Sequence, residues 1–185
     1  MQNLRQLLAP YGELKPQPAT DWTGNTALPT MVEEIYTQIG PHELMISTGG
    51  NSIYVPSLAK LSTLQVGYRT DGNTHERIIN WPDEWLVIAA EGANPFIFNC
   101  KDSQIYFDFA GGGKWQPRLL APNIATAFGS LATLSSALAN LDDETDFEDF
   151  EMLPQAREKC IAALVNYMGD AQKAQIFVEI IEWYL

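Results

Sequence analysis

The sequence has few of the residues that metal sites and covalent catalysis require. Its 185 residues include two cysteines and two histidines. None of Cys100, Cys160, His42 and His75 has another Cys or His at the short spacing of a metal-ligating motif. The Gly-x-Ser-x-Gly pattern of hydrolase nucleophiles is also absent. The sequence therefore predicts no catalytic residue, no metal ligand and no cofactor.

Positive charge is scarce as well. Eleven Lys and Arg residues stand against 23 Asp and Glu residues, so the net charge is −12. Nucleic-acid recognition and attraction to anionic membranes both need a cationic face, so we expect neither partner. A basic protein would be attracted. An acidic soluble protein without any functional acidic face would show the same balance.

Long apolar runs are missing too. No run approaches the ~20 residues of a membrane span, and the leucines before Pro10 form too short and polar a segment for a signal peptide. Cys100 and Cys160 are far apart and fit two free, buried thiols in a reducing compartment better than a disulfide. We expect a cytoplasmic protein.

The residues that are present predict a globular α+β domain. Hydrophobic residues make up 46% of the chain, which is enough for a sizeable core. A short helix over 2–9 precedes an irregular arm to residue 27, in which Trp22 is the expected anchor. Helices are also predicted from the Leu28–Pro29 pair to Gly40, after Pro122–Asn123, from Pro154 to about residue 168, and from about Asp170 onward.

The stretch from Trp81 to Trp115 predicts the centre of the fold. Segments 85–90, 96–99 and 105–109 are apolar or alternating and are joined by tight turns, so we expect antiparallel strands. Segment 85–90 is apolar throughout, which is typical of a strand covered on both faces. Two earlier strands are expected at 44–47 and 53–55. No further strand is predicted between residue 109 and Pro122.

Two groups in this stretch resemble catalytic features. Gly111–Lys114 lacks the first glycine and the final Ser or Thr of a phosphate-binding loop, so a flexible strand exit is favoured. Asp83 and Glu84 could act as acids, although a turn-forming role at a strand entrance is favoured. A small-ligand pocket beside Trp81, Trp85 and Trp115 remains an alternative.

One strong charge run lies near the C-terminus, and it leaves two hypotheses open. It is either a solvated linker over 142–153 or a docking segment for a cationic protein. Phe147 and Phe150 fit the docking hypothesis or a linker pinned to the core. The candidate partner-binding residues are Asp142, Asp143, Glu144, Asp146, Glu148, Asp149 and Glu151.

Several blocks, in order, resemble the SUKH superfamily, which includes the fungal cell-wall-assembly regulator and bacterial toxin immunity proteins. The resemblance covers residues 28–141, with 1–27 as an arm and 154–185 as a helical extension packed on the same domain. Relatives often have Gly-Gly-Asp-Pro in the central turn, where this chain has Gly92-Ala93-Asn94-Pro95. The matching blocks are LPTMVEEIYTQIG, GGNSIYVPSLAKL, WPDEWLVIAAEGANPFIFNC and GGGKWQPRLLAPNIATAFGSLATL.

The resemblance implies a mainly antiparallel sheet flanked by helices and no established catalytic residues. It implies an immunity protein that binds a polymorphic toxin of the nuclease or deaminase type and covers its active site. A basic toxin domain is the expected partner. The alternatives are a regulatory or scaffold protein of the same fold and, third, a small-ligand-binding domain. Nothing in the sequence indicates an oligomeric state.

Overall fold

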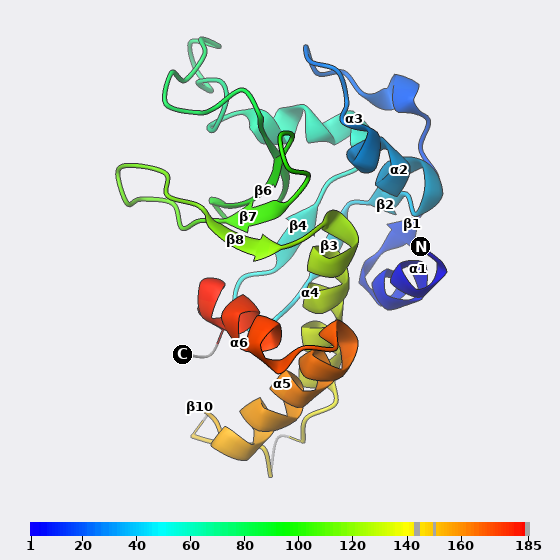
Figure 1. Ribbon diagram of the computed structural model, residues 1–185, viewed down its shortest axis with the longest axis vertical. Helices are drawn as coiled ribbons and strands as arrows, with labels where there is room; N and C mark the ends of the chain where they lie inside the picture. Colours follow the sequence, from blue (N-terminus) through cyan, green and yellow to red (C-terminus); the bar gives the residue numbers. More distant parts are fainter. Residues whose placement is uncertain (143–144, 150, 184–185) are drawn as a thin grey trace.

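The computed structural model describes residues 1–142, 145–149 and 151–183. Its helices and its six-stranded antiparallel sheet make an α+β fold, which confirms the predicted class (Figure 1).

The main sheet is a meander in which each strand pairs with its neighbour in the chain. The strand order is β3-β4-β5-β6-β7-β8, and every pair is antiparallel. The five expected strands are present, with β5 and β6 the longest. The strands are β3 (Leu44–Ile46), β4 (Ile53–Val55), β5 (Trp85–Glu91), β6 (Asn94–Asn99), β7 (Ile105–Phe107) and β8 (Arg118–Ala121).

Strand β8 was not predicted from the sequence. Arg118 and Leu119 are exposed, and β8 pairs only with β7 at the edge of the sheet. An edge strand with two exposed residues shows no alternation of apolar and polar positions, so the pattern carried no strand signal. Gly111–Lys114 is followed by this strand and not by a helix. A phosphate-binding loop is followed directly by a helix, so this arrangement agrees with the decision against such a loop.

The meander brings three connections to one end of the sheet, which we call the turn end. These are the β3–β4, β5–β6 and β7–β8 connections, because alternate turns of an antiparallel meander lie at the same end. Gly49, Gly92, Gly111 and Gly113 have positive φ angles there, between 57° and 97°. Such backbone favours glycine, so the turn end presents little side-chain cover.

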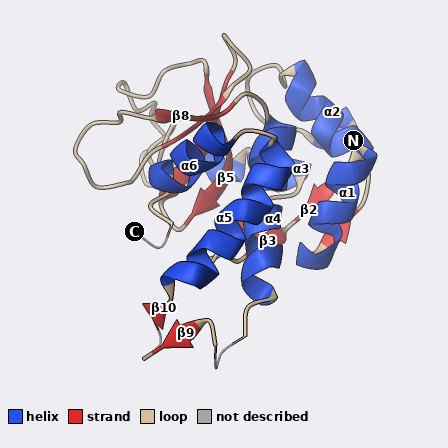
Figure 2. Cartoon of the chain, turned by 60° about the horizontal axis from the view of Figure 1, so that its bottom comes forward, coloured by secondary structure: helices blue, strands red, loops and turns tan. Residues whose placement is uncertain are grey.

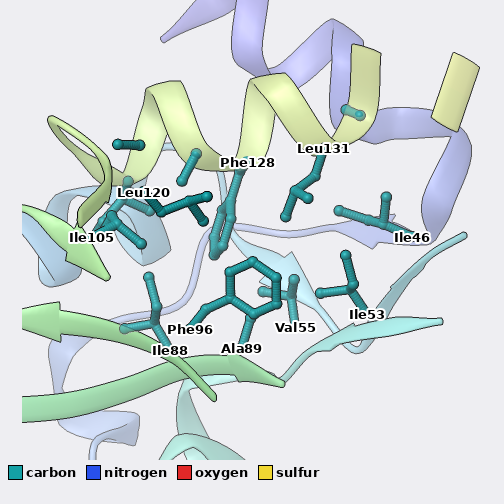
Figure 3. Close-up of a cluster of buried hydrophobic side chains, with 14 of the residues drawn as sticks. Ile46, Ile53, Val55, Ile88, Ala89, Phe96, Ile105, Leu120, Phe128 and Leu131 are labelled. Carbon is teal, nitrogen blue, oxygen red and sulfur yellow. The ribbon is translucent and has the colours of Figure 1, made fainter. Parts of the chain in front are cut away.

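Helix α4 (Ile124–Ala139) covers one face of the sheet (Figure 3). It begins at Asn123, whose side-chain oxygen accepts a hydrogen bond from the Thr126 amide at 2.8 Å. Phe128 and Leu131 point from the helix toward Phe96 and the strands, and all three are at least 98% buried. This interface is the main hydrophobic core.

The opposite face of the sheet is covered by the chain between β4 and β5. Tyr68 and Trp81 pack there against Val87 and Ile97. Buried Gln65 ties this segment to β5, because its amide nitrogen donates to the Val87 carbonyl at 2.8 Å and its oxygen accepts from the Val87 amide at 3.0 Å. Strand β5 is thus covered on both faces, as predicted.

Apart from α3 and the Thr63–Gln65 turn, which belong to the chain between β4 and β5, the remaining elements precede β3 or follow α4. The C-terminal helices join the main core through Leu164, Phe177 and Trp183, among others. The Arg118 guanidinium on β8 donates to the Ile180 carbonyl at 2.6 Å and links the sheet edge to α6. The elements are α1 (Gln2–Leu8), β1 (Glu13–Leu14), α2 (Thr30–Gln38), β2 (Pro41–His42), α3 (Leu58–Leu61), β9 (Phe147–Glu148), β10 (Glu151–Met152), α5 (Pro154–Met168) and α6 (Ala171–Ile180), with 3-10 turns at Ala9–Tyr11, Ala19–Asp21 and Thr63–Gln65.

The close contact between Gly129 on α4 and Tyr167 on α5 leads us to expect that a larger residue at position 129 destabilises the fold. A Cβ atom on Gly129 would overlap the ring end of Tyr167, whose hydroxyl donates to the Ala125 carbonyl at 3.2 Å. Gly129→Ala should therefore lower the free energy of unfolding by about 1–3 kcal/mol in chemical denaturation. In a Tyr167→Leu background the same change should cost less, because the overlap is gone. Gly112→Ala is the control, since its nearest contact would be 4.0 Å away. An equal cost of Gly129→Ala in both backgrounds would contradict this account.

Candidate protein-interaction surfaces

The space between the three tryptophans is filled, although Trp115 also borders two of the depressions described below. Trp81 is fully buried, and its ring centroid lies 5.3 Å from Trp85, 5.4 Å from Trp115 and 5.3 Å from Tyr68. Edge-to-face and tilted packing at these distances is ordinary core packing of aromatic rings. The tryptophans therefore hold the loops against the sheet.

Asp83 and Glu84 form ion pairs at the entrance to β5. Asp83 pairs with Arg77, and Glu84 pairs with Lys101. These hydrogen-bonded cations lower the pKa of both carboxyl groups. A general acid at neutral pH needs a raised pKa, so the geometry favours the turn-forming role.

The acidic segment contains a small hairpin, as well as chain without regular structure. Strands β9 and β10 pair antiparallel, with Glu151 opposite Glu148 and Met152 opposite Phe147. Asp149 lies in the turn with φ of 49°, a conformation that Asp and Asn tolerate better than most residues. Asp143, Glu144 and Phe150 lie outside the described residues.

Asp146 holds this hairpin to the rest of the molecule. Its side chain is 3% exposed, and one carboxylate oxygen accepts from the Lys159 ammonium on α5 at 2.6 Å. The other oxygen accepts from the Asp142 amide at 3.0 Å, and the Asp146 carbonyl accepts from the Leu153 amide at 2.9 Å. Asp146 therefore belongs to the framework of the segment, and a partner could not reach its carboxylate directly.

The other described acids of the segment are accessible. Asp142, Glu148, Asp149 and Glu151 are exposed, whereas Phe147 is half-buried. The hairpin lies beyond the ends of α4 and α5, away from the six-stranded sheet, in both Figure 1 and Figure 2. The segment thus presents acidic side chains at one extremity of the molecule.

A second surface, the turn end of the sheet, was not predicted. Three depressions open there, with volumes of about 190, 280 and 410 Å³. The largest is bordered by Tyr68, Gly92 and Trp115, and no acidic or basic residue lines it. Glu91 and Glu182 line the smallest. Glycines in three alternate connections of the meander were the available sequence signal, but only the strand order shows that these connections share one end.

The described residues contain no grouping of three or more His, Cys, Asp or Glu side chains placed to hold a metal ion. Among the same residues, no helix combines the length and apolarity needed to cross a membrane. Both cysteines are free, but Cys100 is exposed in the β6–β7 turn, which corrects the expectation that both thiols are buried. Cys160 is buried, as expected.

The charged carboxylate of Asp146 should stabilise the hairpin over a defined pH range. The Lys159 ammonium and the Asp142 amide lower the pKa of its carboxyl group. A lowered native pKa means that the carboxylate stabilises the fold above the ordinary aspartate range and loses this effect as pH falls through the native pKa. Hydrogen exchange of amides 147–149 and 151–152 should therefore have equal protection at about pH 5 and pH 7. Asp146→Asn should reduce that protection, and Asp149→Asn should not. Unchanged protection in Asp146→Asn would contradict this role.

Comparisons with protein-family models, with curated proteins and with solved structures found no match for this chain. A family assignment therefore depends on the quoted sequence blocks and on the order of the helices and strands.

Proposed function

We propose that this chain is a non-enzymatic, protein-binding member of the SUKH superfamily that acts as an immunity protein. It binds a basic bacterial toxin domain of the nuclease or deaminase type and covers the toxin's active site. The observation that carries the proposal is the acidic hairpin, which is exposed, free of basic residues and held in place by Asp146. The cytoplasm is the proposed site of action.

Charge supports this choice of partner. No Lys or Arg occurs from Asn140 to Ala156, and among the described residues Lys159 pairs with the buried Asp146 and not with the exposed Glu148, Asp149 or Glu151. An acidic surface of this kind attracts a cationic active site that normally binds a polyanionic substrate. Acidic side chains of the immunity protein would then occupy the site that normally binds this substrate.

The order of secondary structure gives further support. The four quoted blocks fall in order on helix α2, on strand β4, on the hairpin of β5 and β6, and on β8 with helix α4. The closing helix also carries much of the core. Agreement of element order supports the fold assignment more than it supports a function.

Rescue of growth is the first test. The protein encoded beside this gene is expressed with and without the chain, and growth and complex formation are measured. We expect protection together with a stable complex. A specific complex without protection would favour the regulatory or scaffold alternative, and the absence of both would contradict any pairing with that neighbour.

Association kinetics test the role of the hairpin. The triple variant Glu148→Gln, Asp149→Asn, Glu151→Gln removes exposed acids and leaves the buried Asp146 in place. We expect the association rate constant for the toxin domain to fall about threefold to tenfold at low ionic strength. The difference from the unmodified chain should disappear at high salt.

The matched control is Glu34→Gln, Glu76→Gln, Glu158→Gln. These three residues are also exposed, none takes part in an ion pair among the described residues, and the net charge changes by the same amount. Equal slowing by both triple variants would mean that only total charge matters. In that case residues 142–153 act as a linker.

A further inference from the structure

The smallest depression at the turn end, which we call the Glu91 pocket, lies where three segments meet. They are the β3–β4 turn, the adjoining ends of β5 and β6, and the turn after α6. The Trp183 indole donates to the Thr48 carbonyl at 2.6 Å and holds the C-terminal segment against the turn. At about 190 Å³ the pocket is smaller than the roughly 300–1,000 Å³ of small-molecule sites. Its size suits a single side chain.

The walls of this pocket combine apolar surface with negative charge. Ile53, Phe96 and Trp183 contribute apolar surface, and each is more than 95% buried. Glu91 and Glu182 are the ionisable residues in the lining, which contains no Lys, Arg or His. The pocket is therefore built for a group that is apolar along its length and positively charged at one point.

The Glu91 carboxylate has no counter-charge among the described residues. It lies at the pocket wall, because a Cβ atom on Gly50 would be 3.3 Å from its Oε1 atom. Partial burial raises the pKa of Glu91, and a hydrogen bond from the Asn94 side chain opposes that rise only in part. By contrast, Glu43 and Glu84 are paired with lysines. A desolvated carboxylate of this kind is stabilised by a cation that enters beside it.

We infer that the Glu91 pocket receives a lysine or arginine side chain of a protein partner. The aliphatic part of that side chain packs on Ile53, Phe96 and Trp183, as such stems do on apolar surfaces. Its charged end pairs with Glu91, and Glu182 adds a second negative charge. A basic partner is taken from the proposed function, whereas the affinity of the pocket for a cation follows from its own residues.

Small probes test the pocket without any partner. n-Butylammonium and n-butylguanidinium mimic the two side chains, and n-butanol has the same stem without the charge. We expect the two cations to shift the NMR signals of the Trp183 indole N–H and the Ile53 methyl groups, and n-butanol to leave them unchanged. Equal shifts with n-butanol would overturn the inference, because the pocket would then be merely apolar.

Two variants make the probe experiment specific. Glu91→Gln keeps the shape of the side chain and removes its charge, so the variant should fold, and thermal unfolding checks this. It should weaken butylammonium binding at least about fivefold. Glu76→Gln removes an exposed charge elsewhere and should have no effect. Unchanged binding in Glu91→Gln would overturn the inference.

The source of the cation is tested with the toxin domain. Glu91→Gln should weaken that complex about tenfold, mainly through faster dissociation. If butylammonium binds the pocket but Glu91→Gln leaves the complex unchanged, the pocket takes a free amine and the assignment to a partner's side chain is wrong. If the unmodified chain binds no partner, the proposed function fails, and the probes alone decide whether the pocket accepts a cation.

Discussion

Strand β5 has no solvated face, and the elements on both sides of the sheet are arranged to cover it. Leu86 to Ala90 are all buried, and a strand with no solvated face needs a covering layer on each side. Helix α4 supplies one layer, and the aromatic cluster around Trp81 supplies the other. The long chain between β4 and β5 is therefore used for packing, with Gln65 fixing it to the backbone of Val87.

This constraint decides which surfaces remain for binding. With both faces of the sheet covered, its backbone is accessible mainly at its edges and at its turns. The turn end carries shallow depressions and glycine-rich backbone. The second accessible feature is the acidic hairpin at the far end of α4 and α5 (Figure 1). Among the described residues, the acidic hairpin projects from the molecule and the Glu91 pocket is concave, and both carry acidic side chains.

The sequence predicted those parts of the fold that have a local signal. The caps and punctuation at Pro29, Asn123, Pro154 and Gly169 located the helix ends to within about two residues, because capping depends on neighbouring residues. Strand β8 had no such signal, since an exposed edge strand does not alternate. The small β1–β2 pair was missed for a related reason: two-residue strands that meet across the chain leave no periodic pattern.

The candidate site was predicted only in part, for similar physical reasons. Composition located the acidic run, but burial of Asp146 depends on Lys159, which lies on a different element. Glu91 was not singled out from the sequence, because it directly follows the predicted strand 85–90. Its pocket exists because the C-terminal turn with Trp183 packs beside the β3–β4 turn, a contact between segments 135 residues apart. Contacts of this range are a property of the fold and not of any local pattern.

We propose that the chain binds a basic protein through the acidic hairpin and the turn end of the sheet. Hydrogen exchange of the free chain and of its complex with the toxin domain tests this most directly. The account predicts slower exchange on binding at the described residues of the acidic segment and at the turn end around Thr48–Gly50 and Glu91–Ala93. Slower exchange confined to α1 and α2, with both acidic surfaces unchanged, would contradict it.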